Sequence, residues 1–258
     1  MKAVITSAGK GSRVGPIGTV LSKDLFPLFG IQNGKLVNLP LIDFILSDLS
    51  AAGFDEFCFV IGPGQRGALI KDYLNGKEGI QYVVQEEPRG FGDAILRAEK
   101  FVGDEPFAVH ANDVKAIQGY RYMKNFYDLR TPDAILLLRK VDNPKRYGIV
   151  TGGDAGTFEG RRLLRVNGVE EKPENPKSSI AISAVYTFSP KIFSMIRRAP
   201  RHQKTGEIEL TPGIQLMVEE GLSVYGVILD GSDMWLNTGD PKSYKKALDF
   251  TFSSSVLD

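Results

Sequence analysis

Close to its N-terminus the chain reads Ala3-Val4-Ile5-Thr6-Ser7-Ala8-Gly9-Lys10-Gly11-Ser12-Arg13. The apolar residues 3–7 predict a buried strand, and the glycines directly behind them predict a tight turn at the end of that strand. Successive backbone N–H groups in such a turn form a concavity that binds anions, and glycine lets a phosphate approach closely. The stretch therefore indicates a strand that leads into a phosphate-binding loop, although an ordinary glycine turn has the same local pattern.

Two widespread phosphate loops do not fit this stretch. A Walker A loop needs serine or threonine after its lysine, but Lys10 is followed by Gly11. A dinucleotide fingerprint needs a glycine at its sixth position, which is occupied by Val14 when the count starts at Gly9. These mismatches argue against a P-loop NTPase and an NAD-type dehydrogenase.

The rest of the chain alternates short apolar runs with helical patterns, which predicts an α/β sandwich. From about Asn143 to Pro200, turn-rich pieces at 152–154 and 167–168 are expected to separate short strands and to form an insertion or lobe facing the first half. Gly53 is placed to end a helix, and Pro241 to open one. The expected strands are 57–61, 80–84, 106–110, 134–138, 180–188 and 224–229, and the expected helices are 41–52, 92–101 and 241–252.

The composition of the 258 residues, 42% hydrophobic and 24% charged, is that of a globular enzyme. A formal net charge of +1 gives no global field that would attract nucleic acid or an anionic membrane. The single cysteine, Cys58, lies in an apolar run and is expected to be a core residue, which fits a reducing compartment. No run of about 18 apolar residues is present, and the N-terminal run is too short for a signal peptide. We therefore expect a cytoplasmic protein.

Two cations flank the glycine-rich loop. Arg13 closes the loop itself, and Lys23 follows in the segment 22–28. Fixed cations neutralise the charge that builds up during phosphoryl transfer, a reaction that depends on positioning and electrostatics more than on covalent chemistry. The loop and its cations together favour a nucleoside triphosphate as the ligand.

The loop 8–13, with Lys23 and Pro27-Leu28 at this spacing, resembles the signature loop of glucose-1-phosphate uridylyl- and thymidylyltransferases, which are sugar-1-phosphate nucleotidylyltransferases. Any one segment is weak evidence, but the resemblance continues through seven segments in the family's order. Residues 85–94 resemble the base-binding segment, and 111–113 resemble the metal-binding turn. Residues 146–150 and 169–173 resemble the sugar-phosphate segments. The last two segments are 205–211 and 235–239.

The resemblance implies a Rossmann-like α/β/α sandwich with a mixed, mostly parallel central sheet and a sugar-binding insertion. It implies one catalytic domain over 1–258, with a nucleotide-binding half (1–140), a sugar-phosphate-binding half (141–240) and a C-terminal helix and tail (241–258). The implied reaction is in-line, Mg²⁺-assisted attack of a sugar 1-phosphate, expected to be glucose 1-phosphate, on the α-phosphorus of UTP or dTTP. The products would be a nucleotide sugar such as UDP-glucose and pyrophosphate.

The resemblance also implies a role for individual residues. Gln85 would read a pyrimidine by presenting an amide donor and an amide acceptor together. Mg²⁺, which prefers oxygen ligands, would bind Asp113 and Asn237. Arg13 and Lys23 would hold the triphosphate and the departing pyrophosphate, Lys172 would hold the phosphate of the sugar, and these three are the expected catalytic residues. The expected nucleotide contacts are Ala8, Gly9, Gly11, Ser12, Gln85, Gly90 and Asp113. The expected sugar-phosphate contacts are Gly148, Glu171 and Lys172.

Three positions depart from the family pattern. Gly18-Thr19 stands where uridylyltransferases commonly have Thr-Lys, and Ser22-Lys23, where they have Pro-Lys, is more similar to the thymidylyl branch. Asn237 stands where both branches usually place a second metal-binding aspartate. Asparagine still offers a neutral oxygen, and related uridylyltransferases that act on an N-acetylated sugar use it there.

Several alternatives therefore remain open at this stage. UTP and dTTP are not distinguished, and a thymidylyl or dual-specificity enzyme is the main alternative. A non-catalytic regulatory paralogue is a second one, although Arg13, Lys23, Asp113 and Lys172 are all present. We expect no nucleic-acid or membrane partner, and a homo-oligomer, either a dimer or a tetramer.

Overall fold

The computed structural model describes residues 1–116, 119–229 and 235–256. Nine strands of these residues form one central sheet: β1 (Lys2–Ser7), β4 (Glu56–Ile61), β5 (Ile80–Val84), β6 (Phe107–Ala111), β8 (Ala134–Lys140), β9 (Gly148–Phe158), β10 (Arg161–Glu171), β11 (Ile180–Phe188) and β12 (Val224–Ile228).

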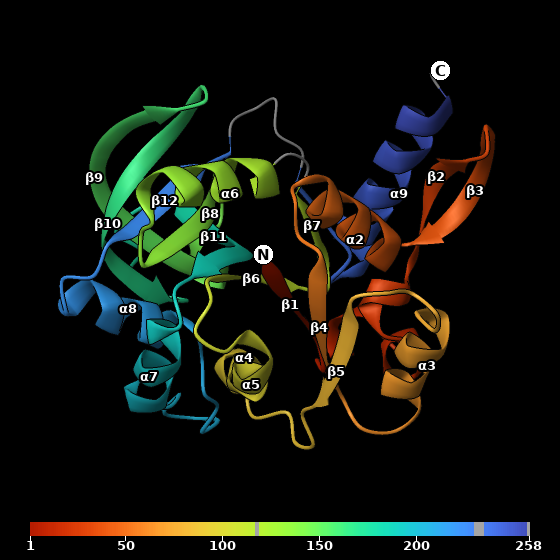
Figure 1. Cartoon of the computed structure of the whole chain (residues 1–258), viewed down its shortest axis with the longest axis horizontal. Helices are drawn as coiled ribbons and strands as arrows, with labels where there is room; N and C mark the ends of the chain where they lie inside the picture. The colour runs from red at the N-terminus through yellow and green to blue at the C-terminus, as the bar shows by residue number, and fades with distance from the viewer. Residues whose placement is uncertain (117–118, 230–234, 257–258) are drawn as a thin grey trace.

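The strands of this sheet follow the order β5-β4-β1-β6-β11-β8-β12-β10-β9 (Figure 1). Neighbours pair in parallel from β5 to β6 and between β8 and β12. The pairings of β11 and β10 with their neighbours are antiparallel, so within the described residues only these two strands run against the others. The predicted mixed, mostly parallel sheet is confirmed.

The remaining strands form two short pairs, β2 (Pro27–Gln32) with β3 (Lys35–Pro40) and β7 (Val114–Ala116) with β13 (Trp235–Asn237). The described helices are α1 (Ile17–Val20), α2 (Leu41–Ala51), α3 (Gln65–Tyr73), α4 (Phe91–Arg97), α5 (Glu99–Val102), α6 (Gly119–Arg130), α7 (Lys191–Arg198), α8 (Thr211–Glu219) and α9 (Pro241–Val256), with short 3₁₀ turns at Ser12–Val14, Lys23–Leu25 and Pro144–Arg146.

Helices cover both faces of the sheet, which explains why its central strands are apolar throughout. Along β1, Ala3 and Ile5 face the layer that contains α2 and α6, while Val4 faces the layer that contains α4, α7 and α8. Cys58 on β4 is buried in the second layer, as expected of a core residue. The alternation in β1 fixes its register and therefore the direction in which its last residues point.

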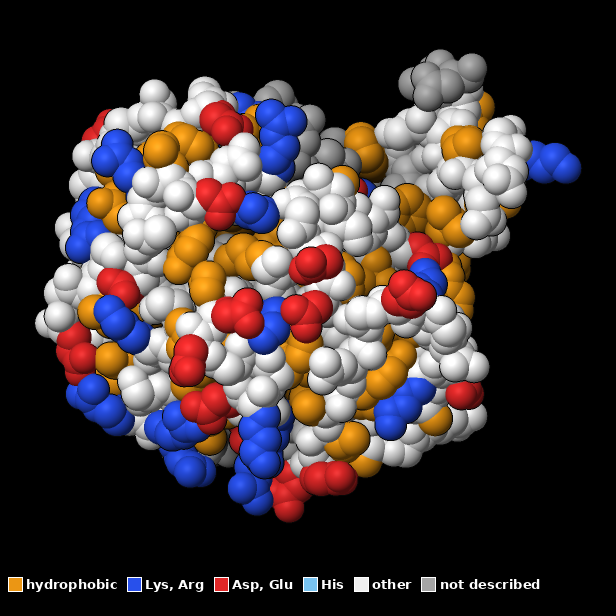
Figure 2. Space-filling view, viewed as in Figure 1, with side chains coloured by type: hydrophobic (Ala, Val, Ile, Leu, Met, Phe, Trp, Pro, Cys, Tyr) orange, Lys and Arg blue, Asp and Glu red, His pale blue; other side chains and the backbone are white. Residues whose placement is uncertain are grey.

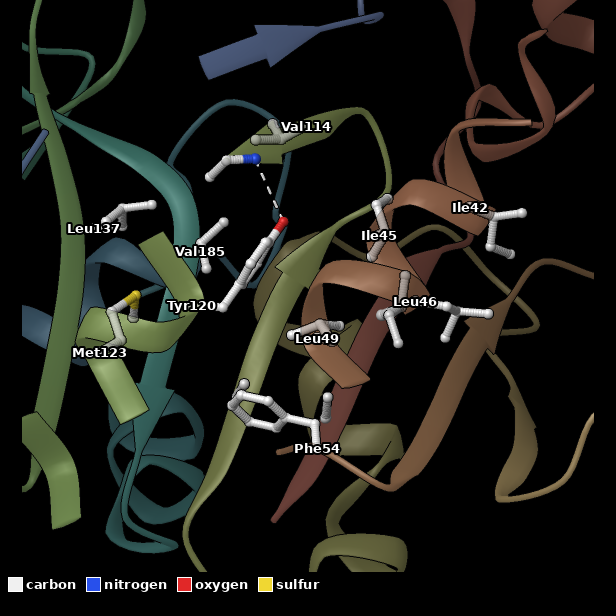
Figure 3. Packing of buried hydrophobic residues seen from close by; sticks show 14 of the residues in the cluster. Ile42, Ile45, Leu46, Leu49, Phe54, Val114, Tyr120, Met123, Leu137 and Val185 are labelled. Carbon is white, nitrogen blue, oxygen red and sulfur yellow. Dashed lines mark hydrogen bonds between the residues drawn. The ribbon is translucent and has the colours of Figure 1, made fainter. Parts of the chain in front are cut away.

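The packing of α2 shows how this first layer is built. Ile42, Ile45 and Leu49 of α2 are fully buried and belong to one hydrophobic cluster with Phe54, Tyr120 and Met123, in which Leu49 lies next to Phe54 (Figure 3). The Tyr120 hydroxyl accepts a hydrogen bond from the backbone N–H of Ala116 at 3.4 Å, so this buried phenol is partnered. These contacts hold the start of α6 and the end of β7 against α2.

Most expected elements are present within one or two residues of their predicted ends, but two expectations are wrong. The helix expected over 92–101 is interrupted at Ala98 and forms α4 and α5. The turns expected at 152–154 and 167–168 lie inside the continuous strands β9 and β10. Register shifts in this hairpin absorb the irregular residues. The true turn is Glu159-Gly160, where both residues have positive φ.

The segment from 143 to 200 contributes β9, β10 and β11 to the central sheet, and β11 lies between β6 and β8. It is therefore an insertion into the sheet itself. No helix of the described residues is both long and apolar enough to cross a membrane. Basic and acidic side chains are interspersed on the face shown in Figure 2.

Candidate active site

A cavity of about 570 Å³ opens where β1 and β6 end side by side. Its wall combines residues from both halves of the chain, from Thr6 to Thr211. Twelve of the residues expected from the sequence line it: Ala8, Gly9, Gly11, Ser12, Arg13, Lys23, Gln85, Gly90, Asp113, Gly148, Glu171 and Lys172.

The glycine-rich loop is shaped by a backbone that only glycine tolerates easily. Gly11 has a φ of 70°, and a methyl group on it would lie 2.5 Å from the carbonyl oxygen of Gly18. The backbone N–H of Val14 donates to the carbonyl of Gly11, which starts the 3₁₀ turn Ser12–Val14. Gly9, in contrast, has no heavy atom within 4 Å of the place where a side chain would start, so the loop is open to a ligand there.

Two cations beside the loop, Arg13 and Lys23, point to the same carboxylate. Lys23 Nζ lies 2.7 Å from Asp113 Oδ2, and Arg13 Nη2 lies 3.5 Å from the same oxygen. Side-chain exposure is 9% for Lys23 and 64% for Arg13, so the lysine is a fixed part of the wall and the arginine reaches toward solvent. Two cations and one carboxylate leave the site with positive charge that suits a polyphosphate.

Asp24, next to Lys23, lies fully buried beneath this loop. Neither of its carboxylate oxygens makes a hydrogen bond of good geometry within the described residues. Burial raises the pKa of this carboxyl above its ordinary value, and the polar groups of Ser7, Ser22 and Asn112 around it oppose the rise. The loop is therefore built over a buried acid that sequence analysis did not single out.

The two expected metal ligands flank one glycine. A methyl group on Gly239 would lie 2.6 Å from Asp113 Oδ2 and 2.8 Å from Asn237 Oδ1. β13 pairs with β7 so that Asn237 stands opposite Val114, beside Asp113. Asn237 Oδ1 accepts a hydrogen bond from the Gly239 N–H at 2.7 Å and, among the described residues, is not part of the cavity wall.

This pair of oxygens fits Mg²⁺ only as part of a coordination set. Both donors are oxygen atoms, which this ion prefers, but the described residues contain no group of three or more His, Cys, Asp and Glu side chains that could hold a metal. Anionic oxygens of a nucleotide would have to supply the remaining ligands. The observed donor set therefore agrees with a metal that binds together with a phosphate.

The side of the cavity that is expected to bind the base is built around Gln85. Its side chain is 4% exposed, and its amide nitrogen donates to the carbonyl of Gly90 at 3.1 Å and to Asp93 Oδ2 at 2.7 Å. The expectation that this amide offers a donor and an acceptor together is therefore wrong for the observed arrangement, because both amide hydrogens are engaged inside the protein. Oε1 is the polar atom that remains for a ligand.

Gly90 has a backbone conformation that requires glycine. Its φ is 112°, and a methyl group on it would lie 2.5 Å from the carbonyl oxygen of Ile208. The N–H of Ile208 donates to the carbonyl of Arg89, and the N–H of Gly92 donates to that of Ile208. These two backbone hydrogen bonds hold residues 89–92, on the side of the cavity expected to bind the base, against the segment that precedes α8.

The opposite wall carries the expected sugar-phosphate residues. Lys172 Nζ lies 2.8 Å from Glu171 Oε1, and Thr211 Oγ1 donates to Glu171 Oε2 at 2.6 Å. Gly148 lies close against both, since a methyl group on it would be 3.2 Å from Thr211 Oγ1. The lysine has a φ of 43°, which is uncommon for a residue with a side chain and sets the direction in which it leaves the strand.

The charged groups on this wall affect the protonation of Lys172 and Glu209. Burial acts to lower the pKa of Lys172, but the hydrogen bond from Lys172 to Glu171 and the charges of Glu171 and Glu209 outweigh it, so this pKa is raised. Burial and the neighbouring Glu171 raise the pKa of Glu209. The lysine is therefore charged across the physiological range, which fits the expected role of binding a phosphate.

The wall also contains residues that the sequence analysis missed. Ile182, Ala184 and Tyr186 come from β11, at a register shift where Ala184 has a φ of 58°. Nothing local in this apolar strand distinguishes residues that line a cavity from residues of the core. Their place follows from the insertion of β11 between β6 and β8.

Comparison with known proteins agrees with this geometry. A family model described as "Nucleotidyl transferase" matches residues 2–254. The chain is 32% identical over 249 residues to UTP–glucose-1-phosphate uridylyltransferase of Bacillus subtilis (strain 168), covering 84% of this chain and 80% of that protein. It is 30% identical over 243 residues to glucose-1-phosphate thymidylyltransferase of Streptomyces antibioticus, covering 93% of this chain and 63% of that protein.

The chain spans only 63% of the length of the Streptomyces antibioticus protein, and 63–65% of the length of two further relatives. Among solved structures, a UDP-glucose pyrophosphorylase complexed with UDP-glucose superimposes with a TM-score of 0.85. The superposition covers 98% of both chains at 22% identity, so it shows a common fold.

Proposed function

The chain belongs to the nucleotidyl transferase family, and we propose that it transfers a nucleotidyl group from UTP or dTTP to a sugar 1-phosphate, releasing pyrophosphate. Glucose 1-phosphate is the proposed acceptor, in agreement with the named activities of the two relatives. One observation carries the proposal: a single cavity has Arg13 and Lys23 beside a phosphate loop on one wall and Lys172 on another. Two separate groups of cations suit two phosphate-bearing substrates.

Different residues of the chain carry out different parts of the proposed reaction. Arg13 and Lys23 hold the triphosphate over the loop 8–12 and stabilise the pyrophosphate as it leaves. Lys172 holds the sugar phosphate, whose oxygen attacks the α-phosphorus in line while the bond to the β-phosphate oxygen breaks. Asp113 and Asn237 would hold Mg²⁺, which supplies charge neutralisation at the phosphates when it is bound. Glu171 and Gly148 contact the sugar hydroxyls.

The proposed division of the chain follows the same plan. Residues 1–140 supply the phosphate loop and the base side, residues 141–240 supply the sugar-phosphate wall, and residues 241–258 supply the C-terminal helix and tail of one catalytic domain. The β2–β3 hairpin and α9 project from the body (Figure 1) and carry exposed apolar side chains, including Ile31 and Phe252. This surface supports the expected homo-oligomer, which light scattering on the purified protein tests.

A two-by-two assay tests the function. UTP or dTTP is incubated with Mg²⁺, with or without glucose 1-phosphate, and release of pyrophosphate is followed. The proposal expects release that depends on both substrates, and the ratio of kcat/KM for the two nucleotides decides between a uridylyl and a thymidylyl enzyme. Nucleotide binding without any release with a panel of sugar 1-phosphates would instead indicate the non-catalytic regulatory paralogue.

A further inference from the structure

The side-chain amide of Gln85 is held in one orientation. Its two nitrogen-bound hydrogens go to the Gly90 carbonyl and to Asp93 Oδ2, at donor–acceptor distances of 3.1 and 2.7 Å. A carbonyl and a carboxylate can only accept hydrogen bonds, so the amide cannot be turned around without placing oxygen against oxygen twice. Among the hydrogen bonds of the described residues none ends on Oε1. Gln85 lines the cavity, so Oε1 is the polar atom of this amide that is left for a ligand there.

Asp93 is itself fixed in place. It lies in the first turn of α4 and is 5% exposed. Arg97, one turn further along the helix, donates to it through Nη2 at 3.0 Å and through Nε at 3.4 Å. A guanidinium can only donate: Nη2 donates to Oδ1, and the more distant Nε donates to Oδ2, the oxygen that also accepts the shorter hydrogen bond from Gln85. Gln85 and Arg97 both donate to Asp93, so the carboxylate acts as an acceptor toward each of its neighbours.

We propose that Asp93 is a specificity-determining positioning residue, which makes Gln85 present only an acceptor and so selects a base with a ring N–H at that place. Uracil and thymine carry a hydrogen on N3, whereas N3 of cytosine is an acceptor. A cytosine bound in the same position would place two acceptors face to face in a buried site, which leaves both without a partner. Sites built around one buried hydrogen bond reject the analogue that lacks its partner.

This inference rests on the proposed function for the identity of the ligand, since it assumes that the base of a nucleotide lies against Gln85. It deepens that function, because it assigns the choice between imide pyrimidines and cytosine to a residue that need not touch the base. It also predicts that UTP and dTTP are accepted alike at this contact, because both present the same N3–H.

The substitution Asp93→Asn tests the assignment with almost no change of shape. The asparagine amide can donate to Gln85 Oε1, which leaves only the Gly90 carbonyl, at the longer distance of 3.1 Å, to favour the original orientation. The glutamine can then turn and present its nitrogen to the base. We expect the wild-type protein to prefer UTP over CTP by about 10- to 100-fold in kcat/KM, as for loss of one buried hydrogen-bond partner. In Asp93→Asn this ratio should fall about tenfold, mainly through a lower KM for CTP, while the KM for sugar phosphate stays unchanged.

Asp72→Asn on the exposed face of α3 is the matched control, because it makes the same chemical change and removes the same charge. It should keep the wild-type ratio. An unchanged ratio in folded Asp93→Asn, with a thermal unfolding midpoint near that of wild type, would overturn the proposal. So would equal use of UTP and CTP by the wild-type protein, a result that needs no variant to fold.

Direct binding separates this proposal from the proposed function. Calorimetry of UTP and CTP with the wild-type protein and with Asp93→Asn, without sugar phosphate, measures the same ratio in Kd. If no sugar 1-phosphate releases pyrophosphate but UTP binds more tightly than CTP and Asp93→Asn removes the difference, the function fails and the inference stands. If transfer occurs but the two nucleotides bind equally, the inference fails and the function stands.

Discussion

Lys23 Nζ lies 2.7 Å from Asp113 Oδ2, and the two side chains are only 9% and 11% exposed. This ion pair ties the segment after the phosphate loop to the end of β6, across 90 residues of sequence. β1 and β6 are parallel neighbours, so the residues that follow them leave the sheet at the same edge. The proposed triphosphate cation and the proposed metal ligand are thus one preassembled unit. A polyphosphate that binds there meets a cation and a carboxylate already held together.

The first prediction concerns the proposed metal ligands. Because Asp113 is the only carboxylate of the proposed pair, Mg²⁺ should bind poorly to the free protein and well only with nucleotide present. Asn237→Asp should tighten Mg²⁺ binding, and Asp113→Asn should lower kcat by about 10²-fold or more if the metal carries charge in the transition state. Titration of activity with Mg²⁺ on the three proteins measures both effects.

The ion pair requires a control in that experiment. Removing one partner of a buried pair leaves the other uncompensated, which typically costs about 3–5 kcal/mol of stability. Asp113→Asn must therefore be compared with wild type well below its own unfolding temperature, as monitored by circular dichroism. Tight Mg²⁺ binding to the wild-type protein without nucleotide would contradict the proposed division of charge.

The second prediction concerns Lys172. Lys172→Ala should lower kcat/KM for the sugar phosphate by about 10²-fold, because a charge-assisted contact to the attacking phosphate is lost. Affinity for UTP in the absence of sugar phosphate should change little. Calorimetry with UTP and steady-state kinetics with glucose 1-phosphate measure the two quantities. An equal loss in both would mean that Lys172 holds the nucleotide instead.

The third prediction is that pyrimidine nucleotides are preferred over ATP and GTP. A methyl group placed on Gly90 would lie 2.5 Å from the Ile208 carbonyl oxygen, so Ile208 stands directly behind this wall and leaves it little room to move away from a larger ring. We expect UTP to exceed ATP by at least about tenfold in kcat/KM with glucose 1-phosphate. Competition assays at equal nucleotide concentrations check the order, and equal rates with ATP would refute the assignment of the base side.

The fourth prediction concerns pH and the buried Asp24. Burial raises the pKa of its carboxyl, so its protonated form is favoured by folding. The stability that this group contributes is complete below the unfolded pKa of about 3.9 and is lost as pH rises through the higher folded pKa. Asp24→Asn does not lose stability in this way. Its unfolding temperature should therefore rise relative to that of wild type between pH 4 and pH 8. Parallel pH profiles for the two proteins would show that Asp24 is not destabilising when charged.

Sequence patterns predicted those parts of the molecule that depend on local order. An apolar run followed by glycines was enough to place Gly9 and Gly11 at the end of a buried strand, and the apolar run 106–110 placed Asp113 just after β6. The position of β11 between β6 and β8 could not be read from its residues, because an apolar strand is compatible with many neighbours. The insertion of Ala184 and Tyr186 into the cavity wall was missed for that reason.

The orientation of Gln85 was beyond the sequence for a different reason. An amide has a donor end and an acceptor end, and only its partners decide which end faces a ligand. Those partners, the Gly90 carbonyl and Asp93, come from the turn and helix that follow β5, and their distances to the amide depend on how α4 packs. Similarly, glycines at 152–153 suggest a turn, but cross-strand pairing with β10 keeps them in a strand.

We propose above all that the nucleotidyl group of a pyrimidine nucleoside triphosphate, which contains the α-phosphate, is transferred to a sugar phosphate in this cavity. The most direct measurement uses UTP or dTTP labelled either at the α- or at the γ-phosphate, together with glucose 1-phosphate and Mg²⁺, and separates the products by chromatography. We predict that the α-label appears in a nucleotide sugar and the γ-label in pyrophosphate, in equal amounts. A γ-label found as inorganic phosphate, or an α-label that stays in UMP or UDP with no dependence on the sugar phosphate, would contradict the account.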